Sequence, residues 1–200
     1  MANNVYTPGT GFAQSSYVDQ IGSALPGSLA YASDQRLVDS YIVQPSIGAD
    51  GLEAGIGVVS AVIPSNEREG FREGVNTKYV GAPAVGATEA NFEGITVRNQ
   101  QMDTNTAGKA CWFANRMCNV LRAKRVGGRI WVQLSNGSSA VDGDVYWIIS
   151  DTTAHGKKIG SFSASALGDD TVKLTNAKFK SVADASTDVV IALVELAEGA

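Results

Sequence analysis

Apolar and polar residues alternate over much of the chain in the pattern of β-strands separated by tight turns. Residues 127–150, GGRIWVQLSNGSSAVDGDVYWIIS, contain two such runs, Arg129–Leu134 and Asp144–Ile149. Because a tight polar connection joins them, we predict that they form adjacent strands, with the rings of Trp131 and Trp147 mostly buried. The pattern consists of strands and turns without catalytic groups, which indicates a protein that forms binding surfaces.

Other segments predict further strands. Leu37–Val43 alternates regularly, which is typical of a strand with one buried face. Leu52–Ile63 is long, rich in β-branched residues and interrupted by glycines, which predicts bulges or a close neighbour. Shorter strands are predicted at Ser28–Ala32, Val75–Val80 and Phe92–Arg98, and in the run GKKIGSFSASA.

Two C-terminal segments predict finer features. In Val172–Lys180 the apolar positions change parity around Asn176, which a β-bulge would produce. Asp188–Leu196 is almost wholly apolar, so we expect a central strand buried on both faces.

The segment Ala107–Arg125 fits two structures. Its apolar residues fall on one face of a helix, but Met117–Leu121 could equally continue as a strand toward Gly127. Because the neighbouring elements are strands, we favour a strand at Met117–Ala123. The segment is also the most basic part of the chain, but an acidic protein without interleaved exposed aromatic residues is not expected to bind nucleic acid there.

Two segments are candidates for contact with a partner. Residues 1–26 are rich in glycine and proline but carry Tyr6, Phe12 and Tyr17, which is typical of an extended arm that becomes ordered against another surface; a frayed terminus is the alternative. Residues 65–74, SNEREGFREG, place one aromatic ring among charges and form either a solvated loop or an intersubunit contact. The candidate contact residues in this second segment are Arg68, Phe71 and Arg72.

Composition limits the classes of function. The chain has 200 residues, enough for one domain with a sizeable core, and a net charge of -4, which disfavours a nucleic-acid-binding protein. It contains neither a membrane-spanning apolar run nor the pattern of a signal peptide. We therefore expect a soluble protein made in the cytoplasm, with no membrane partner.

Candidate catalytic and metal-binding residues are few. His155 is the only histidine and lies in a turn-like segment, so no nucleophile–base pair and no zinc ligand set can be assembled around it. Cys111 and Cys118 are seven residues apart, too far for a disulfide on a straight strand or helix, and are expected to be buried, reduced thiols. Asp142-Gly143-Asp144 is only a fragment of a calcium-binding loop. We expect no catalytic residue, metal or cofactor.

Four segments, in order along the chain, resemble the structural cement (capsid decoration) proteins of tailed bacteriophages. They are GSLAYASDQRLVDSYIV, then GLEAGIGVV, then CNVLRAKRVGGRIWVQL with DGDVYWIIS, and finally IGSFSASA with NAKFKSVA and VVIALVEL. Their order and the run Arg129-Ile130-Trp131-Val132 carry the resemblance, which covers most of residues 27–197. Residues 64–115 and the N-terminal arm are longer than the family pattern.

This resemblance implies an all-β fold: an antiparallel β-barrel or sandwich, jelly-roll or β-tulip-like, over residues 27–200, with an extended arm at residues 1–26. It also implies a virion protein, made in the cytoplasm of the host bacterium, that binds the outer surface of the capsid and stabilises contacts between major capsid protein subunits. The expected assembly is a homo-oligomer, either a dimer or a trimer.

Other functions remain possible at this point. A carbohydrate-binding β-sandwich module would need exposed aromatic residues on one face, whereas Trp112, Trp131 and Trp147 lie in apolar or strand-like runs. A tail or fibre component is a further alternative. An enzyme is disfavoured by the missing residue pairs.

Overall fold

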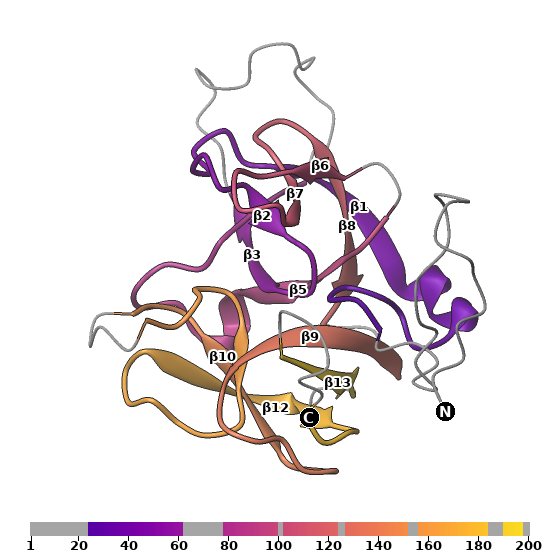
Figure 1. Cartoon of the computed structure of the whole chain (residues 1–200), viewed down its shortest axis with the longest axis vertical. Helices are drawn as coiled ribbons and strands as arrows, with labels where there is room; N and C mark the ends of the chain where they lie inside the picture. Colours follow the sequence, from indigo (N-terminus) through magenta and orange to yellow (C-terminus); the bar gives the residue numbers. More distant parts are fainter. Residues whose placement is uncertain are drawn as a thin grey trace, which may run out of the picture.

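The computed structural model describes residues 24–61, 78–99, 102–123, 127–151, 156–183 and 190–197. In these residues the structure is almost entirely β (Figure 1). Two 3₁₀-helices, η1 (Ala32–Leu37) and η3 (Glu89–Asn91), are the helical elements described. Of the predicted arm, residues 1–26, only residues 24–26 belong to the described part.

The strands form two small closed barrels and one short sheet. The first barrel has the order β1-β4-β3-β5-β8, and the second has the order β10-β11-β9-β13-β12. The first barrel contains β1 (Val38–Val43), β4 (Tyr79–Gly81), β3 (Gly57–Ala61), β5 (Phe92–Val97) and β8 (Met117–Arg122). The second barrel contains β10 (Asp144–Ile148), β11 (Phe162–Ser163), β9 (Gly128–Asn136), β13 (Ile191–Leu196) and β12 (Thr171–Phe179).

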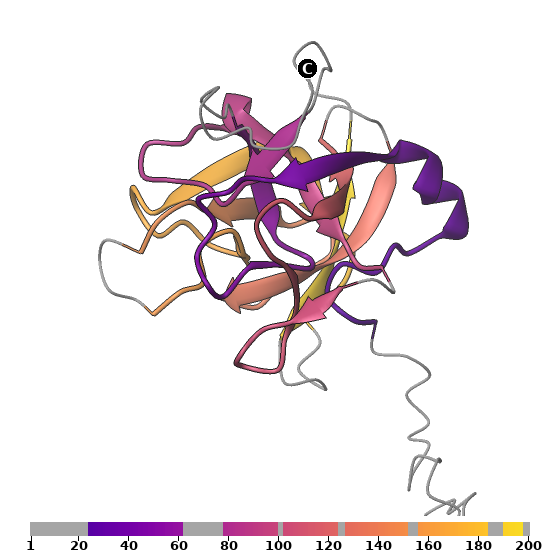
Figure 2. The same cartoon turned by 90° about the horizontal axis from the view of Figure 1, so that it is seen from above.

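The short sheet has the order β2-β7-β6 and lies beside the first barrel (Figures 1 and 2). It consists of β2 (Leu52–Glu53), β7 (Ala110–Trp112) and β6 (Asp103–Thr104). Closing a barrel removes free strand edges, so the open edges among the described sheets belong to β2 and β6. The predicted all-β barrel class is confirmed, and it is built from two barrels.

Several local predictions are also confirmed. β8 is a strand and not a helix, because it pairs antiparallel with β1 from Val38 opposite Leu121 to Ile42 opposite Met117. The bulge in β12 is present: Val145 lies opposite Leu174, whereas the preceding Asp144 lies opposite Lys178.

The predicted pairing of the two tryptophan strands is wrong. β11 lies between β9 and β10, because β9 pairs with β13 along its first residues and with β11 near its end. Trp147 is fully buried, but Trp131 is only partly buried. On β9 the buried residues Ile130 and Val132 flank Trp131, so its ring lies on the opposite face of the strand.

Other strand predictions change in extent. β13 is not buried on both faces, because Leu193 and Glu195 alternate with the buried residues and retain solvent contact. In Ser28–Ala32 only Leu29 forms a β-bridge, with Ile130, and η1 follows. The long run Leu52–Ile63 is divided by a turn at Gly55, and the strand in GKKIGSFSASA is limited to β11.

A continuous hydrophobic core joins the barrels. One cluster of buried residues combines Phe92, Ile95 and Leu121 of the first barrel with Trp147 and Phe162 of the second. The rings of Phe92 and Trp147 meet edge to face, with 5.0 Å between their centroids. A second cluster connects the first barrel with the short sheet. The two barrels therefore bury their apolar side chains against each other in one core.

The chain enters this body between the barrels. The N–H of Gly27 donates to the carbonyl of Trp131 at 2.7 Å, and the N–H of Arg98 donates to the carbonyl of Gly27 at 2.8 Å. Gly27 and Gly55 both have positive φ, +81° and +75°. A Cβ on Gly55 would lie 2.7 Å from the nitrogen of Gly27, so the two backbones can cross here only because both residues lack side chains.

The two cysteines are buried free thiols, as predicted. Burial raises the pKa of Cys111, and it raises the pKa of Cys118 to about 12. Both side chains are therefore uncharged at neutral pH and act as small apolar core groups.

Candidate functional site

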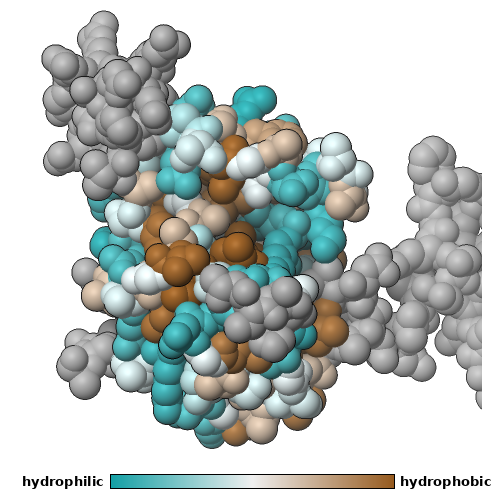
Figure 3. Space-filling view, turned by 90° about the vertical axis from the view of Figure 1, so that its left-hand side faces the viewer, coloured by the Kyte–Doolittle hydropathy of each residue, from teal (hydrophilic) through white to brown (hydrophobic). Residues whose placement is uncertain are grey.

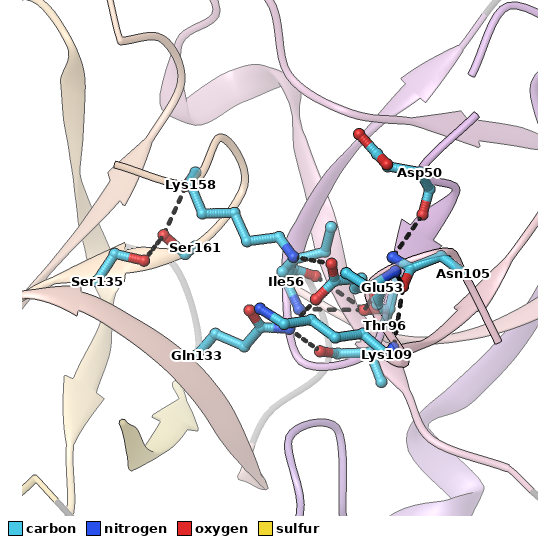
Figure 4. A network of polar contacts seen from close by, with 12 residues as sticks. Asp50, Glu53, Ile56, Thr96, Asn105, Lys109, Gln133, Ser135, Lys158 and Ser161 are labelled. Atoms are coloured by element: carbon cyan, nitrogen blue, oxygen red, sulfur yellow. Dashed lines mark hydrogen bonds and ion pairs between the residues drawn. The ribbon is translucent and has the colours of Figure 1, made fainter. Parts of the chain in front are cut away.

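A polar network lies at the junction of the two barrels and the short sheet. Its centre is Glu53 of β2, whose carboxylate is almost fully buried. Figure 4 shows Gln133 and Lys158 of the second barrel pointing toward Glu53. A charged side chain in the interior requires such partners, because an unpaired buried charge would cost several kcal/mol.

Both side chains from the second barrel contact the Glu53 carboxylate directly. The Gln133 amide donates to Oε2 of Glu53 at 3.1 Å and lies 2.8 Å from the carbonyl of Ala54. Lys158, in the connection before β11, forms an ion pair with Oε1 of Glu53. The backbones are linked in the same place, since the N–H of Gln133 donates to the carbonyl of Gly55 at 3.0 Å. The network thus fixes the short sheet against the second barrel.

The first barrel and the β6–β7 hairpin complete the network. The Thr96 hydroxyl of β5 donates to the carbonyl of Glu53 at 2.8 Å. Asn105 accepts hydrogen bonds from the N–H groups of Ala107 and Lys109 at 3.0 and 2.9 Å. Its amide also donates to the carbonyl of Asp50 at 3.1 Å. Asn105 thus ties the hairpin together and joins it to the segment before β2 (Figure 4).

A cavity of about 410 Å³ opens beside this network. It is bounded by the incoming chain, by the turn after β2, by the β6–β7 hairpin and by β9. Its lining residues are Leu25, Pro26, Glu53, Ala54, Arg98, Thr104, Ala107, Gly108, Lys109, Ala110 and Gln133. Burial lowers the pKa of the Arg98 guanidinium, which nevertheless remains charged at neutral pH.

The Glu53–Lys158 ion pair gives a prediction for stability. Lys158→Met should lower the free energy of unfolding by about 2–4 kcal/mol, because it leaves the buried carboxylate without its counter-charge. Urea denaturation of wild type and variant measures the loss. The double variant Glu53→Gln/Lys158→Met removes both charges and should recover most of it. Equal stability of wild type and Lys158→Met would contradict a structural role for the pair.

The candidate contact residues of the sequence lie outside the described residues. This applies to Tyr6, Phe12 and Tyr17 of the arm and to Arg68, Phe71 and Arg72 of the charged segment, and also to His155. The structure therefore does not test their roles. The described residues contain no group of three or more His, Cys, Asp or Glu side chains that could hold a metal ion. They also include no helix long and apolar enough to cross a membrane.

Some apolar side chains are exposed on the face of the molecule drawn in Figure 3. Figure 3 shows hydrophobic residues near the middle of this face, bordered by hydrophilic ones. The β4–β5 connection and the connection before β11 lie on this side (Figure 1) and carry the exposed residues Val85 and Ile159.

Trp112 and Trp147 are buried, so they cannot form the aromatic platform that a carbohydrate-binding module would need.

The residues of the polar network were not predicted from the sequence. Glu53 was the available signal, because it is a lone acid inside the apolar and glycine-rich run Leu52-Glu53-Ala54-Gly55-Ile56. No local pattern marks its partners Gln133 and Lys158, which lie about 80 and 105 positions further along the chain (133 − 53 = 80 and 158 − 53 = 105).

The chain is similar to known phage proteins in sequence and in fold. A family model described as "Structural cement protein (E217 gp24/Pam3 gp6)" matches residues 13–196. A chain in the solved structure titled "The capsid of Myoviridae Phage XM1" has 16% sequence identity and a TM-score of 0.52, over 92% of this chain and 97% of that chain. At this identity the likeness shows a shared fold. The comparison with curated proteins found no match.

Proposed function

The chain belongs to the phage structural cement protein family, and on that premise we propose that it binds the outer surface of a phage capsid and stabilises contacts between major capsid protein subunits. The observation that carries this proposal is the family match over residues 13–196, which includes both barrels. The two closed barrels of the described residues support it, because closed barrels have no free strand edges through which copies could pair with one another.

The proposal includes the assembly and location of the protein. We expect a homo-oligomer, a dimer or trimer, whose partner is the major capsid protein. The protein would be made in the cytoplasm of the host bacterium and would reside on the outer face of the virion. The net charge of -4 supports a role without direct contact to nucleic acid.

Binding alone is sufficient for this function. A ligand that binds only the assembled shell shifts the equilibrium toward that state, without any chemical turnover. We therefore propose that the protein is not an enzyme and uses no cofactor.

The proposal predicts a gain in particle stability that depends on occupancy. Capsids without the protein should lose DNA at lower temperature, and adding back the purified protein should restore wild-type resistance. At a free concentration about 100 times the dissociation constant, each site contributes about 2.7 kcal/mol to the assembled state. Thermal DNA release, followed by dye fluorescence against protein concentration, measures this effect. Undecorated particles that resist heat equally well would refute the proposal, and His155→Ala should behave like wild type in the same assay.

The arm is proposed as a second contact with the capsid. Deleting residues 1–20 should weaken capsid binding but leave the melting temperature of the barrels nearly unchanged, because Tyr6, Phe12 and Tyr17 would contact the partner and not the body. Cosedimentation with capsids, compared with calorimetry of the free protein, separates the two effects. If the truncated protein bound capsids as tightly as the full-length protein, a contact between the arm and the capsid would be excluded. Phe71→Ala in full-length protein tests the charged segment in the same way.

A further inference from the structure

The cavity at the barrel junction has an unbalanced positive charge. The Glu53 carboxylate is already paired with Lys158, so it does not neutralise other cations. Arg98 donates from Nε to the carbonyl of Pro26 at 3.1 Å and has no ion pair among the described residues. The same is true of Lys109, whose backbone N–H is bonded to Asn105. Two cationic residues therefore line the cavity without a described acidic partner.

Several cationic residues on the strands of the second barrel are compensated. Lys173 and Lys178 of β12 share the carboxylate of Asp144, each at 2.6 Å. Arg129 of β9 is paired with Glu195 of β13. In a chain of net charge -4, the cavity thus differs from these neighbouring surfaces by its excess of positive charge. Electrostatic complementarity favours an anionic occupant.

An open strand edge borders the same cavity. β6 pairs with β7 and is the outer strand of the short sheet. Thr104 of β6 lines the cavity, as do the apolar side chains of Leu25, Pro26 and Ala107. An extended peptide can add to such an edge through main-chain hydrogen bonds, while neighbouring pockets accept its side chains. An edge strand with an apolar lining suits a peptide better than a polynucleotide, which requires a longer basic surface.

We propose that this cavity receives an extended acidic segment of the major capsid protein. The backbone of the segment would run beside β6, and a carboxylate of Asp or Glu would pair with Lys109 or Arg98. This inference rests on the proposed function, since it names the part of the capsid that the protein recognises. It assigns recognition to the barrel junction, in addition to the arm.

Charge reversal tests the pairing. Lys109 is exposed in the hairpin and has no side-chain partner among the described residues, so Lys109→Glu should fold normally. Lys173→Glu is the matched control, because Lys173 is also exposed and Asp144 retains Lys178. We expect Lys109→Glu to weaken binding to purified undecorated capsids about tenfold and to reduce its salt dependence. Lys173→Glu should bind like wild type, and melting temperatures check that both variants are folded.

The outcomes separate this inference from the function on which it rests. If wild type binds capsids and the two variants bind equally, the inference alone is overturned. If wild type does not bind capsids, the proposed function is overturned and the inference with it.

Crosslinking identifies the occupant. A photo-crosslinking amino acid at Ala107, an exposed residue of the cavity lining, is placed in the otherwise unchanged full chain and irradiated on capsids. Mass spectrometry should find the adduct on a segment of the major capsid protein that contains Asp or Glu. Adducts found mainly on a second copy of this chain, on packaged DNA or on a segment without acidic residues would overturn the inference, as would the absence of any adduct.

Discussion

Trp147→Ala is expected to lower the free energy of unfolding by about 3–5 kcal/mol. The Trp147 side chain is fully buried in the core cluster that joins both barrels, and its ring packs against Phe92. Removing the ring leaves a cavity that the closed strands on both sides cannot collapse to fill. Because the cluster belongs to both barrels, urea denaturation should show a single transition shifted to lower urea, by tryptophan fluorescence and by circular dichroism alike.

Trp131→Ala is the matched control for this prediction. It removes the same side chain from the second barrel, but the ring of Trp131 is only partly buried. The expected loss is about 1–2 kcal/mol, in proportion to the smaller apolar area removed from water. Equal losses for the two variants would contradict the different burial of the two rings.

Gly55→Ala is expected to cost about 2–5 kcal/mol, a large effect for the addition of one methyl group. Gly55 has φ +75°, which costs an L-residue about 1–2 kcal/mol. The new Cβ would lie 2.7 Å from the nitrogen of Gly27 and 3.0 Å from Pro26, so the incoming chain must shift at a further cost of about 1–3 kcal/mol. Calorimetry measures the loss. Faster proteolysis near residue 27 would show that the incoming segment is displaced.

Gly86→Ala separates strain from contact. Gly86 has a similar φ, +83°, but a Cβ there would meet nothing within 4 Å. Its replacement should cost only the conformational strain, about 1–2 kcal/mol. A loss at Gly55 no larger than the loss at Gly86 would show that the two backbones do not cross as closely as described.

The alternation of residues in sequence predicted the strands better than their partners. β1, β5, β8, β9 and β10 lie where the pattern predicted strands, because side-chain parity is a local property. Strand order is not local. A polar connection between β9 and β10 is typical of a hairpin, but β11 pairs with the edge of β9 that this hairpin would have used. The predicted burial of the Trp131 ring was wrong for the same reason, since burial depends on which elements cover each face of β9.

The candidate site was predictable only in part. The family resemblance is confirmed, and it was carried by strands and turns that determine the fold. The junction network is assembled from residues far apart in sequence, Glu53, Gln133 and Lys158. Glu53 stands out as a lone acid in an apolar run, but no local pattern marks its two partners. The crossing of Gly27 and Gly55 was indicated in part, because the glycines in Leu52–Ile63 predicted either bulges or a close neighbour.

The insertion of residues 26–30 between the barrels also affects how the chain can fold. Leu29 pairs with Ile130, and the second barrel closes only when β13 joins β9 and β12. During synthesis the segment 26–30 therefore cannot pair until β9, about 100 residues further along the chain, has left the ribosome. Folding should be slow and largely post-translational, because its pairings are so distant in sequence. A partner that recognises the closed barrels can therefore bind only after the whole chain has been made and folded.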